Sequence, residues 1–265
     1  MLPNPDGPRD DEAMAVAVRD ASGAPIASLF QYACHPTCLG GYELSADWPG
    51  AATRSVEAAT GAPCLFVQGC CGDVRPNFTT PNGNFRPATV PESHAAGAVI
   101  GAEVLRLLGG HLTTVSPGLG GEVREIGLEF ATVPDAAELR GIADGGDPRR
   151  TAWARFLLSR PERLGPAAPF RVHRLDLGPE LSILGMEGEI CVGYGFAAKA
   201  SAGGRFVLPA GYADGCTAYI PTAEMFPQGG YEVAESYPYF GMAGPFAPAI
   251  DERIRCVLDS LLRTD

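Results

Sequence analysis

The sequence predicts an α/β fold, partly of the α+β kind, in which helices flank a layered mixed sheet and the active site lies on loops at the carboxyl ends of strands. The composition is that of a folded domain, because 46% of the 265 residues are hydrophobic and 19% are charged. Residues 13–68 contain two strand-like runs, a helix-like run and a further strand-like run, in that order. Turns rich in Gly and polar residues follow these strands, so polar side chains should gather at one rim of the sheet.

The first strands are predicted from their hydrophobic patterns. Residues 13–19 alternate apolar and polar side chains, and residues 25–33 form a mostly apolar run that leads into His35. Residues 63–68 form another short apolar strand and run into a Gly-rich segment that ends at Asp73. Because both segments follow strands of one sheet, we expect His35 and Asp73 on the same rim.

Helices are predicted on either side of the third strand. Asp47 and Pro49 open a helix through residue 58, because Asp47 can cap the first turn and Pro is tolerated there. A second helix is predicted over residues 92–108, and an alternating strand over residues 123–130. These elements continue the α/β pattern beyond the first strands.

The second half of the chain contains a helical segment, a pair of strands and a loop-rich end. Residues 135–165 hold two Arg-rich helical pieces flanked by Gly and Pro, and we expect a peripheral helical insertion there. Two strands within residues 171–186 are predicted to pair as a hairpin. Glu189 then precedes a helix over residues 191–202, whose exposed amides favour an ionised carboxylate. A closing helix at 249–262 follows a long loop-rich stretch.

Charge and hydropathy argue against two classes of partner. Acidic residues outnumber basic ones by 31 to 20 and no Lys/Arg run could follow a phosphate backbone, so no nucleic acid is expected. The apolar stretches are short and interrupted by Gly or Pro, so no transmembrane segment is expected. Residues 1–11 are polar and unlike a signal peptide, which favours a cytoplasmic location.

The eight cysteines are expected to be mostly reduced, because their density is too low for a disulfide scaffold. Cys191 and Cys256 lie in apolar, helix-like segments and are expected to be small core residues. A thiolate metal site is a further interpretation, built from Cys34, Cys38, Cys70 and Cys71. No C-x-x-C pair supports it.

One of the four histidines differs from the others in its surroundings. His35 ends an apolar strand, precedes Pro36 and is surrounded by small polar residues and Gly. His94 lies on a helix, His111 follows a Gly pair at a helix end, and His173 alternates with apolar residues in a strand. His35 is therefore the candidate functional histidine.

Five segments, in order along the chain, resemble motifs of a known family. They are residues 30–37 (FQYACHPT), 44–50 (LSADWPG), 68–77 (QGCCGDVRPN), 188–190 (GEI), and 219–222 (YIPT) with 230–232 (GYE). Together they resemble the core motifs of the neutral/alkaline non-lysosomal ceramidase family, and the resemblance covers nearly the whole chain. It implies a ceramidase-like zinc hydrolase, represented here by the carboxy-terminal part of its catalytic domain.

The resemblance also implies a metal site. In the family, zinc is held by two histidines, a glutamate and a tyrosine. His35 matches the second histidine, Glu189 the glutamate and Tyr219 the tyrosine, and such nitrogen and oxygen donors suit Zn²⁺. Asp47 is expected to accept a hydrogen bond near the site or to steer a water. Tyr231 matches a tyrosine of the substrate pocket and is expected to donate a hydrogen bond to a developing oxyanion.

Two departures from the family pattern change these expectations. The family's first zinc-binding histidine belongs to an upstream motif that this sequence lacks. We therefore expect residues 1–265 to be a single catalytic domain without the family's amino-terminal portion, or a partner chain to provide the missing ligand. Arg75 stands where the family has a serine proposed to attack the amide, and a guanidinium can instead clamp a carboxylate or phosphate. Ceramide is therefore not the expected substrate.

The leading hypothesis is a zinc-dependent hydrolase, an amidohydrolase that cleaves an amide or related acyl bond in a small, anionic substrate. A zinc-activated water would attack the carbonyl, while Arg75 and Tyr231 contact the substrate and stabilise negative charge. Asp47, Arg75 and Tyr231 are therefore the expected catalytic residues.

Two alternatives stay open. The chain could be a non-catalytic fragment or scaffold subunit of a ceramidase-like protein. It could also be a hydrolase with Cys70 or Cys71 as nucleophile, His35 as base and Asp47 as the group that orients the base, since these residue types fit a catalytic triad.

Overall fold

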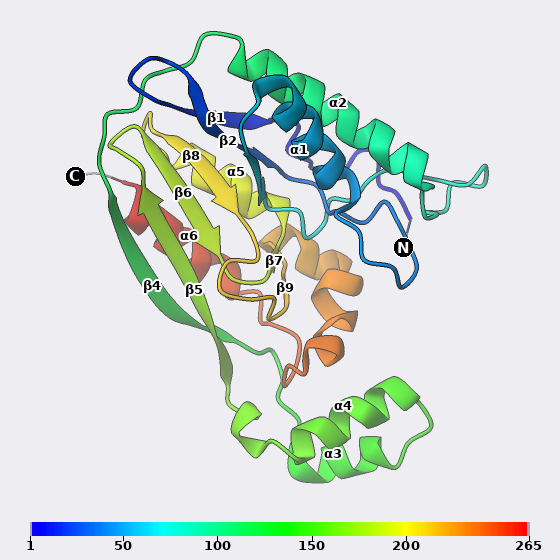
Figure 1. Ribbon diagram of the computed structural model, residues 1–265. Helices are drawn as coiled ribbons and strands as arrows, with labels where there is room; N and C mark the ends of the chain where they lie inside the picture. Colours follow the sequence, from blue (N-terminus) through cyan, green and yellow to red (C-terminus); the bar gives the residue numbers. More distant parts are fainter. Residues whose placement is uncertain (1, 264–265) are drawn as a thin grey trace.

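The computed structural model describes residues 2–263, which form three β-sheets with flanking helices (Figure 1). The strands of the first sheet are β1 (Met14–Arg19), β2 (Pro25–Tyr32) and β3 (Cys64–Gln68). β1 and β2 are antiparallel, whereas β2 and β3 are parallel. The chain therefore leaves β2 and β3 at the same edge of the sheet, and the predicted α/β class is confirmed.

Two helices cover this first sheet. α1 (Asp47–Thr60) connects the parallel strands, and α2 (Val90–Leu108) packs on α1. A capping box begins α2, in which the Thr89 side chain accepts a hydrogen bond from the N–H of Glu92 and the Glu92 carboxylate accepts one from the N–H of Thr89. Phe30 on β2 is fully buried in the apolar core that the helices cover.

The second sheet lies beside the first and has the strand order β4-β5-β6-β8. Its strands are β4 (Gly120–Glu129), β5 (Ala167–Asp176), β6 (Leu181–Met186) and β8 (Phe206–Ala210). β5 and β6 form the predicted hairpin, and β6 pairs in parallel with β8. α5 (Val192–Ala200) and α6 (Ile250–Leu262) pack together and against this sheet over a large apolar cluster.

The two large sheets meet at the end of β3. The N–H of Gly211 donates to the carbonyl of Gln68 at 3.1 Å, and the side chain of Gln31 donates to the carbonyl of Pro209 at 3.0 Å. The third sheet, beside this junction, consists of two short parallel strands, β7 (Glu189–Ile190) and β9 (Tyr219–Ile220). The strands are therefore distributed over three sheets.

Residues 135–165 project from one end of the molecule (Figure 1). They contain α3 (Ala136–Ala143), α4 (Pro148–Leu158) and a 3-10 turn, η1 (Pro161–Arg163). The side chains of Asp135 and Asp147 cap α3 and α4. Trp153 belongs to a separate apolar cluster in this segment and donates its indole N–H to the Met242 carbonyl at 2.7 Å. The segment is helical as expected, and its origin as an insertion stays a prediction.

The carboxy-terminal third contains more regular structure than the sequence pattern predicts. β8 and β9 lie where loops were expected, and short helical turns follow β9. These turns are η2 (Ala223–Gln228), the π-helix η3 (Tyr231–Glu235) and η4 (Tyr237–Phe240). The pattern does not predict β8 because Pro209 within it reads as a strand breaker.

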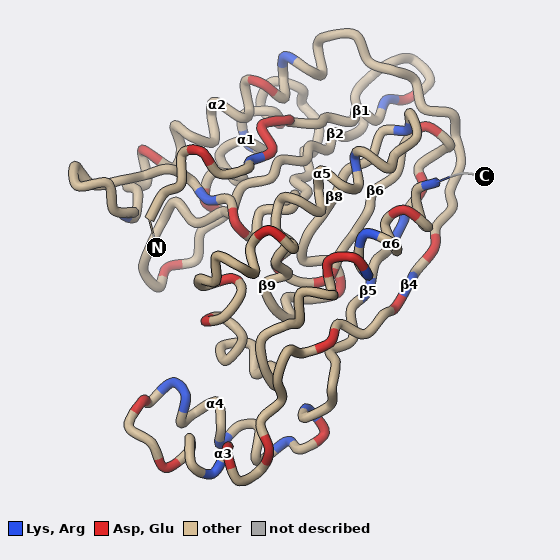
Figure 2. The backbone as a smooth tube through the Cα atoms, turned by 180° about the vertical axis from the view of Figure 1, so that it is seen from behind, with Lys and Arg blue, Asp and Glu red and all other residues tan. Residues whose placement is uncertain are grey.

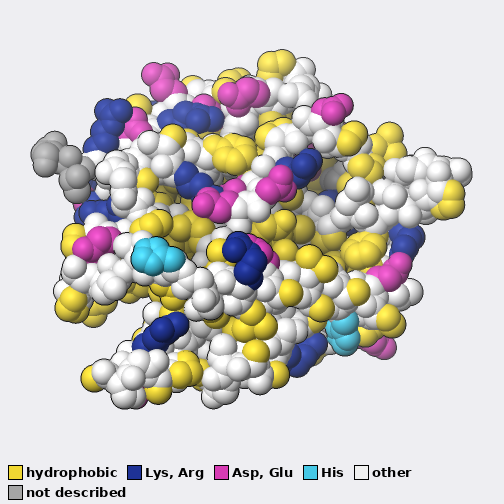
Figure 3. Space-filling view, turned by 90° about the horizontal axis from the view of Figure 1, so that it is seen from above, with side chains coloured by type: hydrophobic (Ala, Val, Ile, Leu, Met, Phe, Trp, Pro, Cys, Tyr) yellow, Lys and Arg dark blue, Asp and Glu magenta, His cyan; other side chains and the backbone are white. Residues whose placement is uncertain are grey.

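Charged residues of both signs are interspersed along the backbone (Figure 2) and over the face seen from above (Figure 3). None of the helices within residues 2–263 has the length and apolar character that a bilayer span requires.

Replacing Gly72 with alanine should weaken the contact between the end of β3 and β7. A Cβ on Gly72 would lie 2.5 Å from the Glu189 carbonyl oxygen and 3.0 Å from the Ile190 carbonyl carbon, and these backbone atoms cannot move aside as a flexible side chain can. We expect the free energy of unfolding, measured with urea, to fall by about 1–3 kcal/mol.

Gly141→Ala in α3 is the matched control, because a Cβ there meets nothing within 4 Å. It should leave the free energy of unfolding unchanged or raise it by about 1 kcal/mol. Equal effects of the two substitutions would contradict the tight packing at Gly72.

Candidate functional site

His35 is held in the loop after β2 by two contacts to its backbone. Its N–H donates to the carbonyl of Val74 at 2.9 Å, which joins it to the loop after β3. The indole N–H of Trp48 donates to the His35 carbonyl at 3.1 Å. Because β2 and β3 are parallel, both loops leave the same edge. His35 and Asp73 consequently line one cavity, on the rim where the sequence places them.

Glu189 and Tyr219 are neighbours across the two-stranded sheet. They form one residue pair of the parallel strands β7 and β9, and the N–H of Glu189 donates to the Ala218 carbonyl at 2.8 Å. Burial raises the pKa of Tyr219, and the neighbouring Glu189 carboxylate adds to the shift. A very short strand pair thus joins two side chains that are distant in the sequence.

Asp73, rather than Glu189, occupies the start of α5. The sequence pattern places Glu189 there, but Glu189 belongs to β7 and the helix begins at Val192. Oδ1 of Asp73 accepts a hydrogen bond from the Val192 N–H at 2.7 Å. Burial raises the pKa of Asp73 to about 6, although that hydrogen bond opposes the shift.

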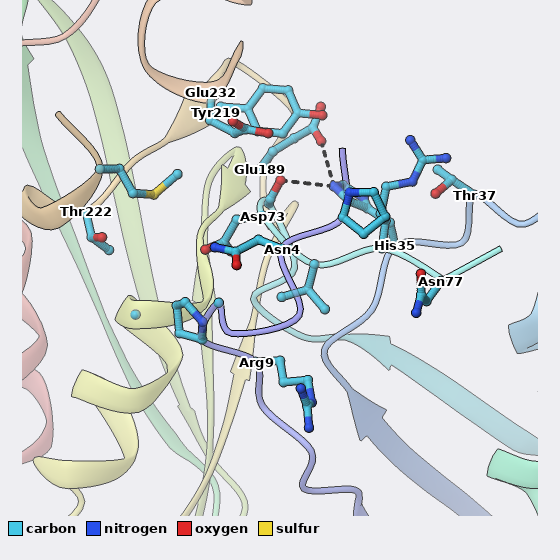
Figure 4. Close-up of a pocket in the computed structure, with 18 of the residues that line it drawn as sticks. Asn4, Arg9, His35, Thr37, Asp73, Asn77, Glu189, Tyr219, Thr222 and Glu232 are labelled. Atoms are coloured by element: carbon cyan, nitrogen blue, oxygen red, sulfur yellow. Dashed lines mark hydrogen bonds and ion pairs between the residues drawn. The ribbon is translucent and has the colours of Figure 1, made fainter. Parts of the chain in front are cut away.

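Tyr212, which no sequence pattern singles out, connects the candidate site. Its hydroxyl lies 3.0 Å from His35 Nδ1 and donates to Glu189 Oε2 at 3.0 Å. His35 Nε2 lies 3.5 Å from the same Glu189 oxygen, and the two side chains point toward one another (Figure 4). A phenol, an imidazole and a carboxylate therefore form a closed triangle of contacts, which we call the site triangle.

The loop that carries Tyr212 has an unusual backbone conformation. Tyr212 has φ of 61° and Asp214 has φ of 64°, a left-handed region that residues other than Gly seldom adopt. His173 Nε2 lies 2.6 Å from Asp214 Oδ2 and anchors the loop to β5. The only sequence signal for Tyr212 is the surrounding Gly-containing run at 211–215, which follows a strand that the pattern does not predict.

Burial sets the protonation states of this cluster. It lowers the pKa of His35 below its usual value, although the neighbouring Glu189 carboxylate opposes the shift. Burial raises the pKa of Tyr212 and of Tyr219, and contact with Glu189 adds to both shifts. At neutral pH the imidazole is therefore neutral, with one unprotonated nitrogen, and both phenols keep their protons.

The site triangle forms part of the wall of a cavity of about 1700 Å³. The lining includes His35, Arg75, Glu189, Tyr212 and Tyr219, together with the acidic residues Asp73, Glu224 and Glu232. Four of the six predicted site residues thus line one cavity of a size that admits a small molecule.

Asp47 does not line this cavity but supports the loop after His35. It is buried, has φ of 50°, and accepts a hydrogen bond from the Leu39 N–H on Oδ2 at 2.8 Å. The expected capping role is wrong, because Ala46 is the N-cap of α1 and Asp47 is the first helical residue. A role for Asp47 in the reaction stays a prediction. Asp47 would act indirectly, through the backbone of the loop that carries His35.

Tyr231 also lies outside the cavity lining. Its ring packs edge-on against the ring of Tyr219, with 5.4 Å between the centroids. Tyr231 therefore contacts a predicted metal ligand, and a contact with substrate stays a prediction.

The predicted cysteine triad does not form. Cys70 and Cys71 are buried, and burial raises the pKa of both thiols far above the usual value, so neither is a ready nucleophile. Nδ1 of His35 is engaged by Tyr212 rather than by a thiol. The Asp47 carboxylate accepts from backbone N–H groups and does not orient the imidazole. The triad interpretation is wrong.

The thiolate metal site is likewise unsupported. Burial raises the pKa of Cys34 and Cys38 to about 12, which keeps the thiols protonated. Across residues 2–263, no three His, Cys, Asp or Glu side chains are grouped so that they could hold a metal ion.

Cys256 is exposed on α6, so its expected place in the core is wrong. The buried side chains of this helix include Ile254 and Leu258. Residues two positions apart on a helix do not share a face, which places Cys256 on the solvent side.

The donors of the site triangle and Tyr219 match zinc in their chemistry. His35 Nε2 lies 3.5 Å from Glu189 Oε2, and the His35 and Tyr219 ring centroids are 6.4 Å apart. Zinc accepts imidazole nitrogen and carboxylate oxygen as ordinary ligands. Because Tyr212 engages Nδ1 of His35, Nε2 is the nitrogen left to face Glu189. A hydrogen bond to the other ring nitrogen is what orients metal-binding histidines in general.

Asp73→Asn should change the pH dependence of stability. Because the folded pKa of Asp73 is raised to about 6, the stability it contributes is complete below its unfolded pKa and is lost as the pH rises from about 4 through about 6. Asn keeps an acceptor for Val192 but cannot titrate. Urea unfolding of the variant should therefore show a smaller loss of stability over this range, and parallel pH profiles would contradict the raised pKa.

Comparisons with known proteins establish the fold. No protein-family model and no curated protein sequence matches the chain. A neutral ceramidase from Pseudomonas aeruginosa shares the fold with a TM-score of 0.70 and 18% identity, over 98% of this chain and 48% of that one. A structure described as ceramidase complexed with C2 gives a TM-score of 0.69 and 16% identity, over 98% and 49%. The chain thus spans about half the length of these structures and has a ceramidase-like α/β fold.

Proposed function

We propose that this chain is the catalytic part of a zinc-dependent hydrolase that cleaves an amide or a related acyl bond in a small molecule. The observation that carries the proposal is the site triangle of His35, Tyr212 and Glu189, with Tyr219 beside it, in the wall of a cavity. The structural neighbours are ceramidases by name, and the sequence motifs resemble that family. Both support hydrolysis of an acyl bond.

His35, Glu189 and Tyr219 would hold the zinc ion in this proposal. Three protein ligands and a fourth position open to water or substrate are the usual arrangement of catalytic zinc. When bound, zinc would polarise the substrate carbonyl and lower the pKa of a nearby water. A partner chain could provide a further ligand beside this position, which stays open to water or substrate.

The chain's own residues prepare the site for a cation. Burial keeps the His35 imidazole neutral, which is the form that binds metals. Tyr212 fixes the ring through Nδ1 and also holds one oxygen of Glu189. Tyr231 packs against Tyr219 and restricts its ring, so we propose that Tyr231 acts by positioning Tyr219. Asp47 would position the His35 loop in the same indirect way.

Wild-type protein should retain about one equivalent of zinc after dialysis. The Glu189→Gln variant should retain no zinc and should not hydrolyse amides. Wild-type protein treated with a chelator should behave like this variant. Elemental mass spectrometry measures the metal. Glu224→Gln is the matched control, because Glu224 lines the same cavity but is outside the site triangle. Zinc retained equally by both variants would contradict the proposed ligands. A stably folded wild type without zinc would favour the scaffold alternative.

Tyr212→Phe should weaken zinc binding by about 10- to 100-fold, because it removes the hydroxyl that orients His35 and Glu189. Competition with a chromophoric chelator measures the affinity. Tyr239→Phe is the control, because the exposed Tyr239 hydroxyl bonds Arg149 outside the site triangle. Unchanged affinity in Tyr212→Phe would show that the hydroxyl does not orient the ligands.

A further inference from the structure

Four arginines line the cavity, and one of them differs from the rest in its partners. Three are ion-paired, as Arg9–Asp11, Arg86–Glu92 and Arg255–Asp251. Nε of Arg75 is buried and has no hydrogen-bond partner within residues 2–263. Among the described residues, Arg75 is therefore the cavity arginine without a carboxylate partner.

Arg75 is placed beside the site triangle by the backbone. It follows Val74, whose carbonyl accepts the His35 N–H at 2.9 Å. The positive charge of Arg75 contributes to the lowered pKa of His35, which is consistent with this proximity. A group bound to Arg75 would thus lie within electrostatic range of His35.

The guanidinium of Arg75 is also fixed in orientation. Its central carbon lies 4.3 Å from the centroid of the Phe85 ring, a cation–π contact that holds the planar group against the aromatic face. Asn77 and Thr37, two hydrogen-bonding side chains of the lining, lie on one side of His35 in Figure 4, and Asp73 and Thr222 lie on the other. The guanidinium fork of Arg75 is suited to a planar or tetrahedral oxyanion.

The acidic residues of the lining make one part of the cavity negatively charged. Asp73, Glu224 and Glu232 line it as well, and Glu232 contributes to the raised pKa of Asp73, so these two carboxylates lie within each other's influence. An anion is repelled by this acidic part of the lining and attracted to Arg75. An anionic ligand would give Arg75 the counter-charge that the other three cavity arginines already have.

We infer that Arg75 binds an anionic oxygen group of the substrate, a carboxylate or a phosphate-type group, close to the acyl bond that is cleaved. The identity of that bond rests on the proposed function, whereas the anion site itself does not. The substrate class is thus an N-acyl or related acyl compound that carries an acidic group, rather than a neutral lipid amide.

Isothermal titration with matched probes tests this inference. N-hexanoylglycine carries a carboxylate, and N-hexanoylglycinamide is its neutral counterpart. Wild type should bind the acid about 10- to 100-fold more tightly than the amide. Arg75→Met should bind both equally, and Arg75→Lys, which keeps the charge without the fork, should show an intermediate preference. Arg9→Met is the control, because Arg9 is exposed and paired with Asp11, and it should keep the full preference.

Equal affinity of wild type for acid and amide, or a preference that survives in Arg75→Met, would overturn the inference. N-hexanoyl-aminomethylphosphonate separates the two anions: tighter binding than the glycine compound assigns the site to phosphate-type groups, and weaker binding assigns it to carboxylates. Hydrolysis is followed in the same samples. A preference for the acid that depends on Arg75, without any hydrolysis, would support the anion site and reject the proposed function. Hydrolysis of the acid and the amide with equal kcat/KM would reject the anion site alone.

Discussion

The backbone contact between Gly72 and β7 is the constraint on which the candidate site depends. The Gly72 N–H donates to the Ile190 carbonyl at 2.8 Å, and the lack of a side chain lets the chain approach Glu189 closely. Because the loop after β3 also carries the Val74 carbonyl that binds His35, this contact sets the position of Glu189 relative to His35. The loop after β8 adds Tyr212 from the third direction.

The polar side chains at this site differ in whether they have hydrogen-bond partners. Buried donors and acceptors are stable only when paired, and the Tyr212 hydroxyl pairs with both His35 Nδ1 and Glu189 Oε2. Burial keeps the imidazole neutral and Tyr212 holds the carboxylate in place, which is what a cation site requires. Arg75 follows Val74 in the loop after β3, and its buried Nε has no hydrogen-bond partner among the described residues. The contrast between the paired triangle and the unpaired guanidinium distinguishes the site for the reacting bond from the site for a ligand anion.

Local sequence signals predicted the parts of the fold that local physics determines. The apolar run before His35, the helix that ends at Leu108 and the hairpin of β5 and β6 are all visible as hydrophobic periodicity. Glu189 and Tyr219 lie on strands too short to have a period, so only the family resemblance identified them. Tyr212 follows β8, a strand that the pattern does not predict because it contains Pro209. The pattern of one segment also cannot show that a side chain contacts two residues from other segments.

An anomalous difference map from crystals grown with zinc tests the central claim most directly. Data collected on both sides of the zinc absorption edge locate the metal without assumptions about its ligands. The account predicts one strong peak among His35 Nε2, the Glu189 carboxylate and the Tyr219 hydroxyl, with Tyr212 still bonded to Nδ1 of the imidazole. A peak elsewhere, or no peak at that position in a crystal with the same fold, would contradict it.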